Sequence, residues 1–213
     1  MTGVSQTVPN DVGPNEVGAV DGRRARGDVT RQTVARAAAR IATVEGLDSI
    51  TVGGLAAVTG VSKSGILTVF GTRESIQIAA VVEARRLYQE WVVLPAWGEA
   101  AGVERLISLI EHWVAYTKAD VFPGGCFVAA TSVEYGHRDG PVAESVQRLK
   151  REWLDLLEAE LTTAGSKNPS DDAFRIDSYL CMGNTRWQLY GDTSEIDRAG
   201  RLALAVIRSE PEA

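Results

Sequence analysis

The chain has few of the residues that build metal, redox or disulfide sites. It contains two cysteines and two histidines in 213 residues, and Cys126 and Cys181 lack the spacing of a metal knuckle or a redox pair. No apolar run approaches the ~18–20 residues that span a bilayer, and the N-terminus lacks the pattern of a secretory signal. We therefore expect a cytoplasmic protein with two free thiols, no metal, no cofactor and no membrane contact.

Positive charge is absent from the first 22 residues and concentrated just after them. Residues 23–75 contain eight basic and four acidic residues, whereas residues 76–213 contain fourteen basic and twenty-one acidic ones, and the net charge of the chain is −6. A basic segment on an acidic body suits a protein that meets phosphate at one end, because the local field matters more than the global sum.

The N-terminal segment, residues 1–28, has no hydrophobic period and contains Pro9 and Pro14. This composition predicts a disordered tail. Its basic end, residues 23–26, has two open interpretations. It is either a solvated linker or an arm that lies along the backbone or minor groove of DNA.

Beyond Thr30 the apolar residues repeat at the helical period, and no alternating β pattern is present. We expect an all-α fold, with a three-helix head over residues 29–75 and a larger helical domain over residues 76–213. In that larger domain we expect a first helix that ends before Pro95. Further helices are expected over residues 102–123, 126–136, 141–163, 172–191 and 194–208.

The segment that starts at Thr51 carries the pattern of two short helices joined by a tight turn. Thr51 and Ser62 can cap the helices, and Gly60 can adopt the positive φ that the turn requires. Ala56 is small where the helices cross, and Ile66 buries the second helix against the first. This spacing is typical of a DNA-reading helix-turn-helix, although an ordinary αα-hairpin would use the same residues.

The second of these helices presents short side chains on its outer face, where they permit close approach to a DNA groove. Their hydroxyl and ammonium groups can bind phosphates or base edges. The predicted DNA contacts on this helix are Ser62, Lys63, Ser64, Gly65 and Thr68.

The stretch from Val61 to Glu74 reads VSKSGILTVFGTRE and resembles the V-S-K-G-T-L-Y-x-H-F-G-S-K-E run of the TetR family of bacterial repressors. A weaker resemblance to one subgroup of TetR sensor domains follows from residues 122–127, 134–135 and 138–142, so that the two together cover roughly residues 30–208. The resemblance implies a homodimer that binds double-stranded operator DNA and is released from it by a small-molecule effector.

Two positions depart from the family pattern. Leu67 and Val69 stand where the family usually has Tyr and His, which help to fix the recognition helix on the phosphate backbone. Their absence leaves Thr51, Lys63, Thr68 and Arg73 as the expected phosphate anchors. Fewer phosphate contacts predict a shallower salt dependence of DNA binding.

The helix predicted over residues 172–191 is apolar on several sides, so more than one neighbour must cover it. Its apolar residues are Ile176, Leu180 and Trp187 on one side and Met182 and Leu189 on another. It either lies inside one subunit or forms a four-helix dimer bundle with residues 141–163, with Cys181 and Gly183 permitting close approach. A two-fold dimer would place its recognition helices ~34–36 Å apart and predicts a palindromic operator.

An effector pocket is predicted in the C-terminal domain. Glu134 shares a helix face with Phe127 and Thr131, and a buried carboxylate there would need a partner or a ligand. The candidate ligand residues are Trp113, Tyr116, Phe127, Thr131, Glu134 and Trp187. We predict a mostly apolar effector with a polar or cationic group near Glu134. In the alternative interpretation the aromatic residues are core and Glu134 is solvated.

A catalytic interpretation of Cys126 with His112 and His137 has little support. Neither histidine pairs with Cys126 at a recognisable spacing, and the sequence has no nucleophile elbow or phosphate-binding loop. We predict a regulator rather than an enzyme.

Overall fold

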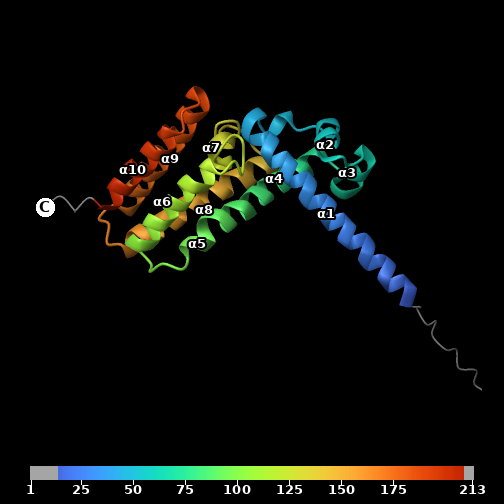
Figure 1. The fold of residues 1–213 in the computed structure, drawn as a ribbon, viewed down its shortest axis with the longest axis horizontal. Helices are drawn as coiled ribbons and strands as arrows, with labels where there is room; N and C mark the ends of the chain where they lie inside the picture. The colour runs from blue at the N-terminus through green and yellow to red at the C-terminus, as the bar shows by residue number, and fades with distance from the viewer. Residues whose placement is uncertain (1–13, 209–213) are drawn as a thin grey trace, which may run out of the picture.

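The structure, a computed structural model, describes residues 14–208, with side chains from residue 27 onward. Within those residues every regular element is helical (Figure 1). The elements are α1 Pro14–Glu45, η1 Leu47–Ser49, α2 Val52–Thr59, α3 Lys63–Phe70, α4 Arg73–Tyr88, η2 Gln89–Val93, α5 Leu94–Ala96, α6 Val103–Lys118, α7 Phe127–Ser132, α8 Pro141–Thr163, α9 Pro169–Tyr190 and α10 Ser194–Arg208. The predicted all-α fold is therefore confirmed for the described part of the chain.

The second half of α1 packs with α2, α3 and the start of α4 to form a small head, which we define as α1 to α3 with η1. The chain direction changes by 115° between α2 and α3, within the range of helix-turn-helix units. Leu55 and Ile66 are fully buried between the helices. The local predictions are confirmed, because Thr51 and Ser62 cap the two helices and Gly60 has a φ of 71°.

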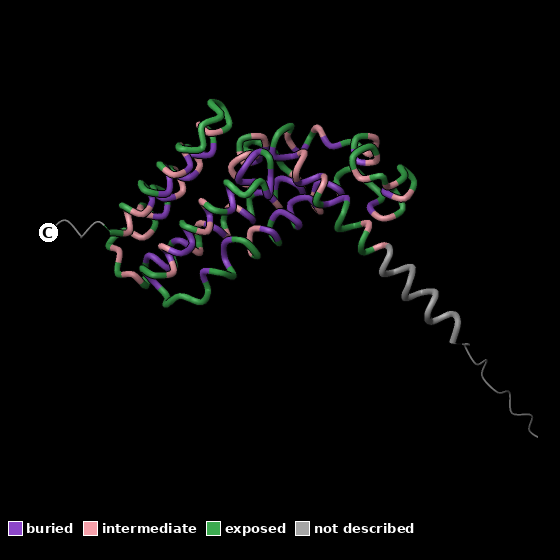
Figure 2. The backbone as a smooth tube through the Cα atoms, in the orientation of Figure 1, coloured by how far each residue is buried: buried purple, intermediate pink, exposed green. Residues whose placement is uncertain are grey.

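The body comprises α4 to α10, and α4 connects it to the head (Figure 1). α9 and α10 form an antiparallel pair that packs on α8 and α6. Buried residues follow the inner faces of these helices and leave the outer faces exposed (Figure 2). Gly183 permits the α9–α10 contact, since a Cβ there would lie 2.4 Å from the Cβ of Ala199. The prediction that Gly183 serves the dimer contact is therefore wrong.

The N-terminal helix is longer than the sequence pattern predicts. α1 starts at Pro14 rather than near Thr30, so the expected tail over residues 1–28 is in part helical. A helix that is already nucleated by the buried 30–45 segment extends at low cost, because only propagation remains, and proline is favourable in a first turn. Residues 1–13, and the side chains of the basic arm at 23–26, lie outside the described residues.

Two elements of the body differ from expectation. The fourth helix does not run unbroken to Pro95 but passes through a π turn, η2, into α5. Proline has no N–H to donate within a helix, and a π turn relieves that loss. The predicted 126–136 helix is regular only over Phe127–Ser132 and then continues as turns over residues 133–137.

In the part of the chain that the structure describes, no single helix has the length and apolar character of a membrane span. The bent pair of α2 and α3 reaches that length and composition only when its two helices are taken together.

Candidate DNA-binding head and effector cavity

The exposed edge of the head carries most of the predicted DNA contacts. Ser62, Lys63 and Ser64 are exposed at the start of α3, with the Ser62 hydroxyl accepting the Gly65 N–H at 3.0 Å. Thr68 is exposed one turn further along the same helix. These side chains lie together at a helix N-terminus, where unpaired N–H groups and the helix dipole favour a phosphate.

Two predicted anchors, one in the head and one at the start of α4, already have hydrogen-bond partners within the subunit. The Thr68 hydroxyl donates to the Ser64 carbonyl at 2.8 Å. The Arg73 guanidinium hydrogen-bonds the Asp48 carbonyl and lies 4.0 Å from the Asp48 carboxylate. A phosphate contact from Arg73 would therefore compete with an existing internal partner.

The structure adds one hydroxyl cap that the sequence analysis did not single out. Thr72 caps α4 by accepting the Ser75 N–H at 3.1 Å. α2, α3 and α4 thus all begin at a Thr or Ser cap. The T-x-x-S spacing of Thr72 and Ser75 was the available signal.

The body contains a cavity that adjoins α4, α6, α7, α8 and α9. Its free volume is about 40 Å³, which holds one or two waters and is far below the roughly 300 Å³ or more of most small-molecule sites. Tyr88, Trp113 and Trp153 provide aromatic walls, and the Tyr88 and Trp153 rings meet edge to face at 5.5 Å.

Two ion pairs add polarity to this apolar cavity. Lys150 donates to both Asp177 oxygens at 2.6 and 2.5 Å, and Arg85 donates to Glu152 at 2.6 Å. Lys150 also borders an outer groove of about 340 Å³ between the end of α7 and α8. It therefore lies between the groove and the cavity.

The two cysteines border the same cavity. Burial raises the pKa of the Cys126 thiol, and burial together with the Asp177 carboxylate raises the pKa of Cys181 to about 12. Both thiols are therefore protonated and weakly nucleophilic near neutral pH.

Of the six predicted ligand residues, the structure places only Trp113 on the cavity wall. Tyr116 and Phe127 are core residues that contact Phe122, and Thr131 is fully buried with its hydroxyl on the Phe127 carbonyl. Trp187 packs beside Gly125. Helix periodicity predicts that these residues face inward, but it does not predict whether they line a cavity or pack in the core.

Glu134 lies outside the cavity lining and faces the head. Its carboxylate accepts hydrogen bonds from the backbone N–H groups of Leu47 and Asp48, at 2.8 and 2.9 Å. The expected pairing of Glu134 with a polar or cationic ligand group is not supported, because both carboxylate oxygens already have partners.

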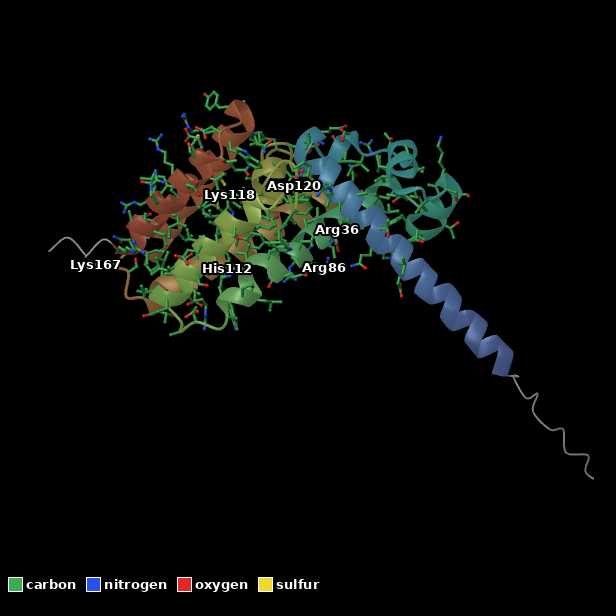
Figure 3. All side chains as sticks on the ribbon, in the orientation of Figure 1. Arg36, Arg86, His112, Lys118, Asp120 and Lys167 are labelled. Atoms are coloured by element: carbon green, nitrogen blue, oxygen red, sulfur yellow. The ribbon has the colours of Figure 1, made fainter. Side chains whose placement is uncertain are left out.

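His112 does not form a site with Cys126. Its Nδ1 lies 2.8 Å from the Ser108 carbonyl one turn back on α6 (Figure 3). His137 is exposed in the turn after α7. Among the described residues no group of three or more potential ligands is arranged to hold a metal ion.

Comparison with known proteins points to one family. Residues 102–203 match the sequence profile described as "Tetracyclin repressor-like, C-terminal domain". The fold is similar to a TetR transcriptional regulator from Chloroflexus aurantiacus, with a TM-score of 0.75 and 21% identity, covering 86% of this chain and 97% of that one. It is similar to a TetR-family regulator from Agrobacterium tumefaciens, with a TM-score of 0.75 and 16% identity over 84% and 97% of the two chains.

A third similar structure is of AibR in complex with isovaleryl coenzyme A and operator DNA. It has a TM-score of 0.66 and 17% identity, and the match covers 82% of this chain and 96% of AibR. No curated protein matches the chain in sequence.

Proposed function

We propose that the chain is a member of the TetR family of DNA-binding transcriptional regulators and acts as a homodimeric repressor in the cytoplasm. The match of residues 102–203 to the TetR-like C-terminal profile and the similarity of the fold to TetR regulators support this proposal. The dimer binds a palindromic operator through α3 and is released when a small molecule occupies the cavity in the body. One observation carries this proposal. The exposed face of α3, which begins at the Ser62 cap, and the aromatic cavity in the body lie in the same subunit, and α4 connects the two.

DNA contact is assigned to Thr51, Ser62, Lys63, Ser64, Gly65, Thr68 and Arg73, as the exposed edge of the head supports. Lys63 is the cation of α3, and Arg73 contributes if it exchanges Asp48 for a phosphate. The structure of AibR with operator DNA supports a DNA-binding role for a chain of this fold.

The effector is proposed to be mostly apolar and aromatic, with a polar group directed at the Lys150–Asp177 pair. Trp113, Tyr88 and Trp153 favour stacking with such a molecule. The outer groove that Lys150 shares with the cavity is the side from which we expect the effector to enter.

The dimer contact is proposed to use the outer face of α9. Met182 and Leu189 are 57% and 69% exposed there, and Phe174 is 70% exposed. Such large apolar side chains on one face are typical of a covered surface. The face turned inward carries Ile176 and Leu180, which are buried in the subunit.

Electrophoretic mobility shift with DNA from upstream of the chain's own gene tests the proposal. We expect a salt-sensitive shift of the dimer, reversed by an apolar aromatic compound that binds the cavity. Absence of a shift with any upstream or genomic fragment at low salt would overturn it, and would favour a ligand carrier or an enzyme.

A further inference from the structure

We propose that the segment from Asp120 to Arg138 transmits occupancy of the cavity to the DNA-binding head, and that Glu134 is its main point of attachment. We call residues 120–138 the coupling segment. The inference rests on the proposed function and names how the effector site and the DNA site communicate.

The start of the coupling segment is attached to α1. Arg40 donates to the carbonyls of Asp120 and Val121 at 3.0 and 2.8 Å, and the Thr43 hydroxyl accepts the Gly124 N–H at 3.1 Å. Asp120 lies where the chain leaving α6 meets α1 (Figure 3). The backbones approach closely, because a Cβ on Gly124 would lie 2.0 Å from the Thr43 carbonyl oxygen.

The end of the coupling segment is attached to the turn that precedes α2. Glu134 accepts the N–H groups of Leu47 and Asp48. Asp48 in turn accepts the Tyr135 hydroxyl at 3.0 Å and forms an ion pair with Arg138. We call these five residues the head–body contact.

The approach of the Glu134 carboxylate to the Leu47 and Asp48 N–H groups requires a glycine at position 46. Gly46 has a φ of 87°, and a Cβ there would lie 3.0 Å from both Glu134 carboxylate oxygens. A charged acceptor on two backbone donors is among the stronger hydrogen-bond arrangements. The Glu134 carboxylate therefore binds the backbone of the head itself rather than one of its side chains.

The middle of the coupling segment forms one wall of the cavity. Cys126, Val128 and Ala129 line it, and the Cys126 N–H donates to the Asn184 side chain of α9 at 2.9 Å. The cavity wall and the attachment to the head are thus on one short stretch of chain, five residues apart between Ala129 and Glu134.

This wall is the one that an occupant displaces most easily. With about 40 Å³ free, a drug-sized molecule must move part of the lining. The walls from α4, α6, α8 and α9 are helices of 16 to 23 residues, whereas α7 has six. Gly136, in the turn after α7, adds backbone freedom at the end that leads to the head.

Movement of this wall would pass to α2 within a few residues. Thr51, the cap of α2, lies three residues after Asp48. Gln77 of α4 also donates to the Leu47 carbonyl, at 2.9 Å. The turn is therefore shared by head and body, and its displacement changes how α2 and α3 are held.

The first experiment measures the contact itself by hydrogen–deuterium exchange of residues 46–50 in the full chain. Glu134→Ala removes the acceptor, and we expect exchange of the Leu47 and Asp48 amides to become at least about 10-fold faster, as for loss of a charge-assisted hydrogen bond. Glu134→Gln should give an intermediate rate. Asp139→Ala, which removes a charge from the same exposed turn, is the matched control and should leave the rate unchanged.

The second experiment uses a larger side chain as a substitute for the unidentified effector. Ala129→Phe places a ring in the cavity, and Ala129→Leu does so more mildly if the first variant fails to fold. We expect either to speed exchange at residues 46–50 and to weaken binding to upstream DNA. In a Glu134→Ala background the same substitution should have little further effect, because the connection is already broken.

Independent effects of the Ala129 and Glu134 substitutions on exchange would overturn the inference, as would an unchanged exchange rate in the Ala129 variants. Exchange does not require DNA binding. A wild-type chain that binds no DNA therefore refutes the proposed function, while the exchange cycle still decides whether the cavity and the head are coupled.

Discussion

The Lys150 ammonium lies 2.6 and 2.5 Å from the two carboxylate oxygens of Asp177, in the wall of a mostly apolar cavity. Both side chains are largely withdrawn from solvent, at 24% and 15% exposure. A pair in such surroundings is stable only while both members are present, because either charge alone would be poorly solvated.

Removal of one member of this pair should therefore destabilise the body more than removal of both. We expect Lys150→Ala to lower the free energy of unfolding by about 2 kcal/mol or more. The double variant Lys150→Met with Asp177→Leu should recover most of that loss. Urea unfolding followed by circular dichroism measures both values, and a double variant as unstable as the single one would contradict the expectation.

Gly124 should tolerate no side chain. A Cβ there would lie 2.0 Å from the Thr43 carbonyl oxygen, so the loop must separate from α1. We expect Gly124→Ala to cost about 1–3 kcal/mol, as overpacking does. Gly136→Ala is the control, since its Cβ would have ordinary contacts of 3.5 Å or more; a similar loss in both variants in thermal unfolding would rule out the clash as the cause.

The head could be predicted from sequence because its determinants are local. An N-cap hydrogen bond joins a hydroxyl to an N–H three residues later, and a positive φ at a glycine serves the turn around it. Both features therefore depend on residues that are near in the sequence. Thr51, Gly60 and Ser62 were identified for that reason, and their geometry confirms the prediction. The burial of Ile66 follows from the same spacing.

The surroundings of the body residues could not be predicted in the same way. Periodicity puts Glu134 and Phe127 on one helix face, but it cannot say that the chain leaves regular helix after Ser132 and brings Glu134 to the head. Gly183 is a similar case, because its partner Ala199 comes from a helix sixteen residues further along the chain. Such contacts are set by tertiary packing, which a single sequence does not display.

Lys63 should contribute to DNA binding through charge rather than through base readout. It is exposed at the start of α3, where an ammonium neutralises one phosphate and releases condensed counterions. We expect Lys63→Ala to weaken binding to all sequences and to reduce the slope of log K against log salt by about 0.9. Arg201→Ala, on the exposed face of α10, should leave the slope unchanged in titrations over several salt concentrations.

The outer face of α9 should control the oligomeric state. Met182→Glu places a charge among Leu189, Phe174 and their copies in the proposed dimer, where it would be desolvated without a partner. We expect the variant to sediment as a monomer under conditions in which the wild type is a dimer. Val133→Glu alters an apolar side chain that is 89% exposed after α7, and it should remain dimeric. If the Met182 variant remains a dimer, the dimer interface does not lie on the outer face of α9.

The Asp48 part of the head–body contact should weaken in acid. The hydrogen bond from Arg138, opposed in part by burial and reinforced by Tyr135 and Arg73, lowers the pKa of the Asp48 carboxyl from its ordinary 3.8. A carboxyl with a lower pKa in the folded state stabilises that state fully above its unfolded pKa. The contribution is lost as pH falls through the folded pKa.

Asp48→Asn should therefore reduce stability near neutral pH and make progressively less difference as pH falls below the ordinary pKa of 3.8 and through the lower pKa of the folded state. Urea unfolding of both proteins across this range measures the gap between them. Asp139→Asn, in the exposed loop before α8, is the matched control for the loss of one surface carboxylate. If the difference in unfolding free energy between wild type and Asp48→Asn stays constant into acid, the Asp48 side chain acts by shape or hydrogen bonding alone. Its charge would then not contribute to the contact with Arg138.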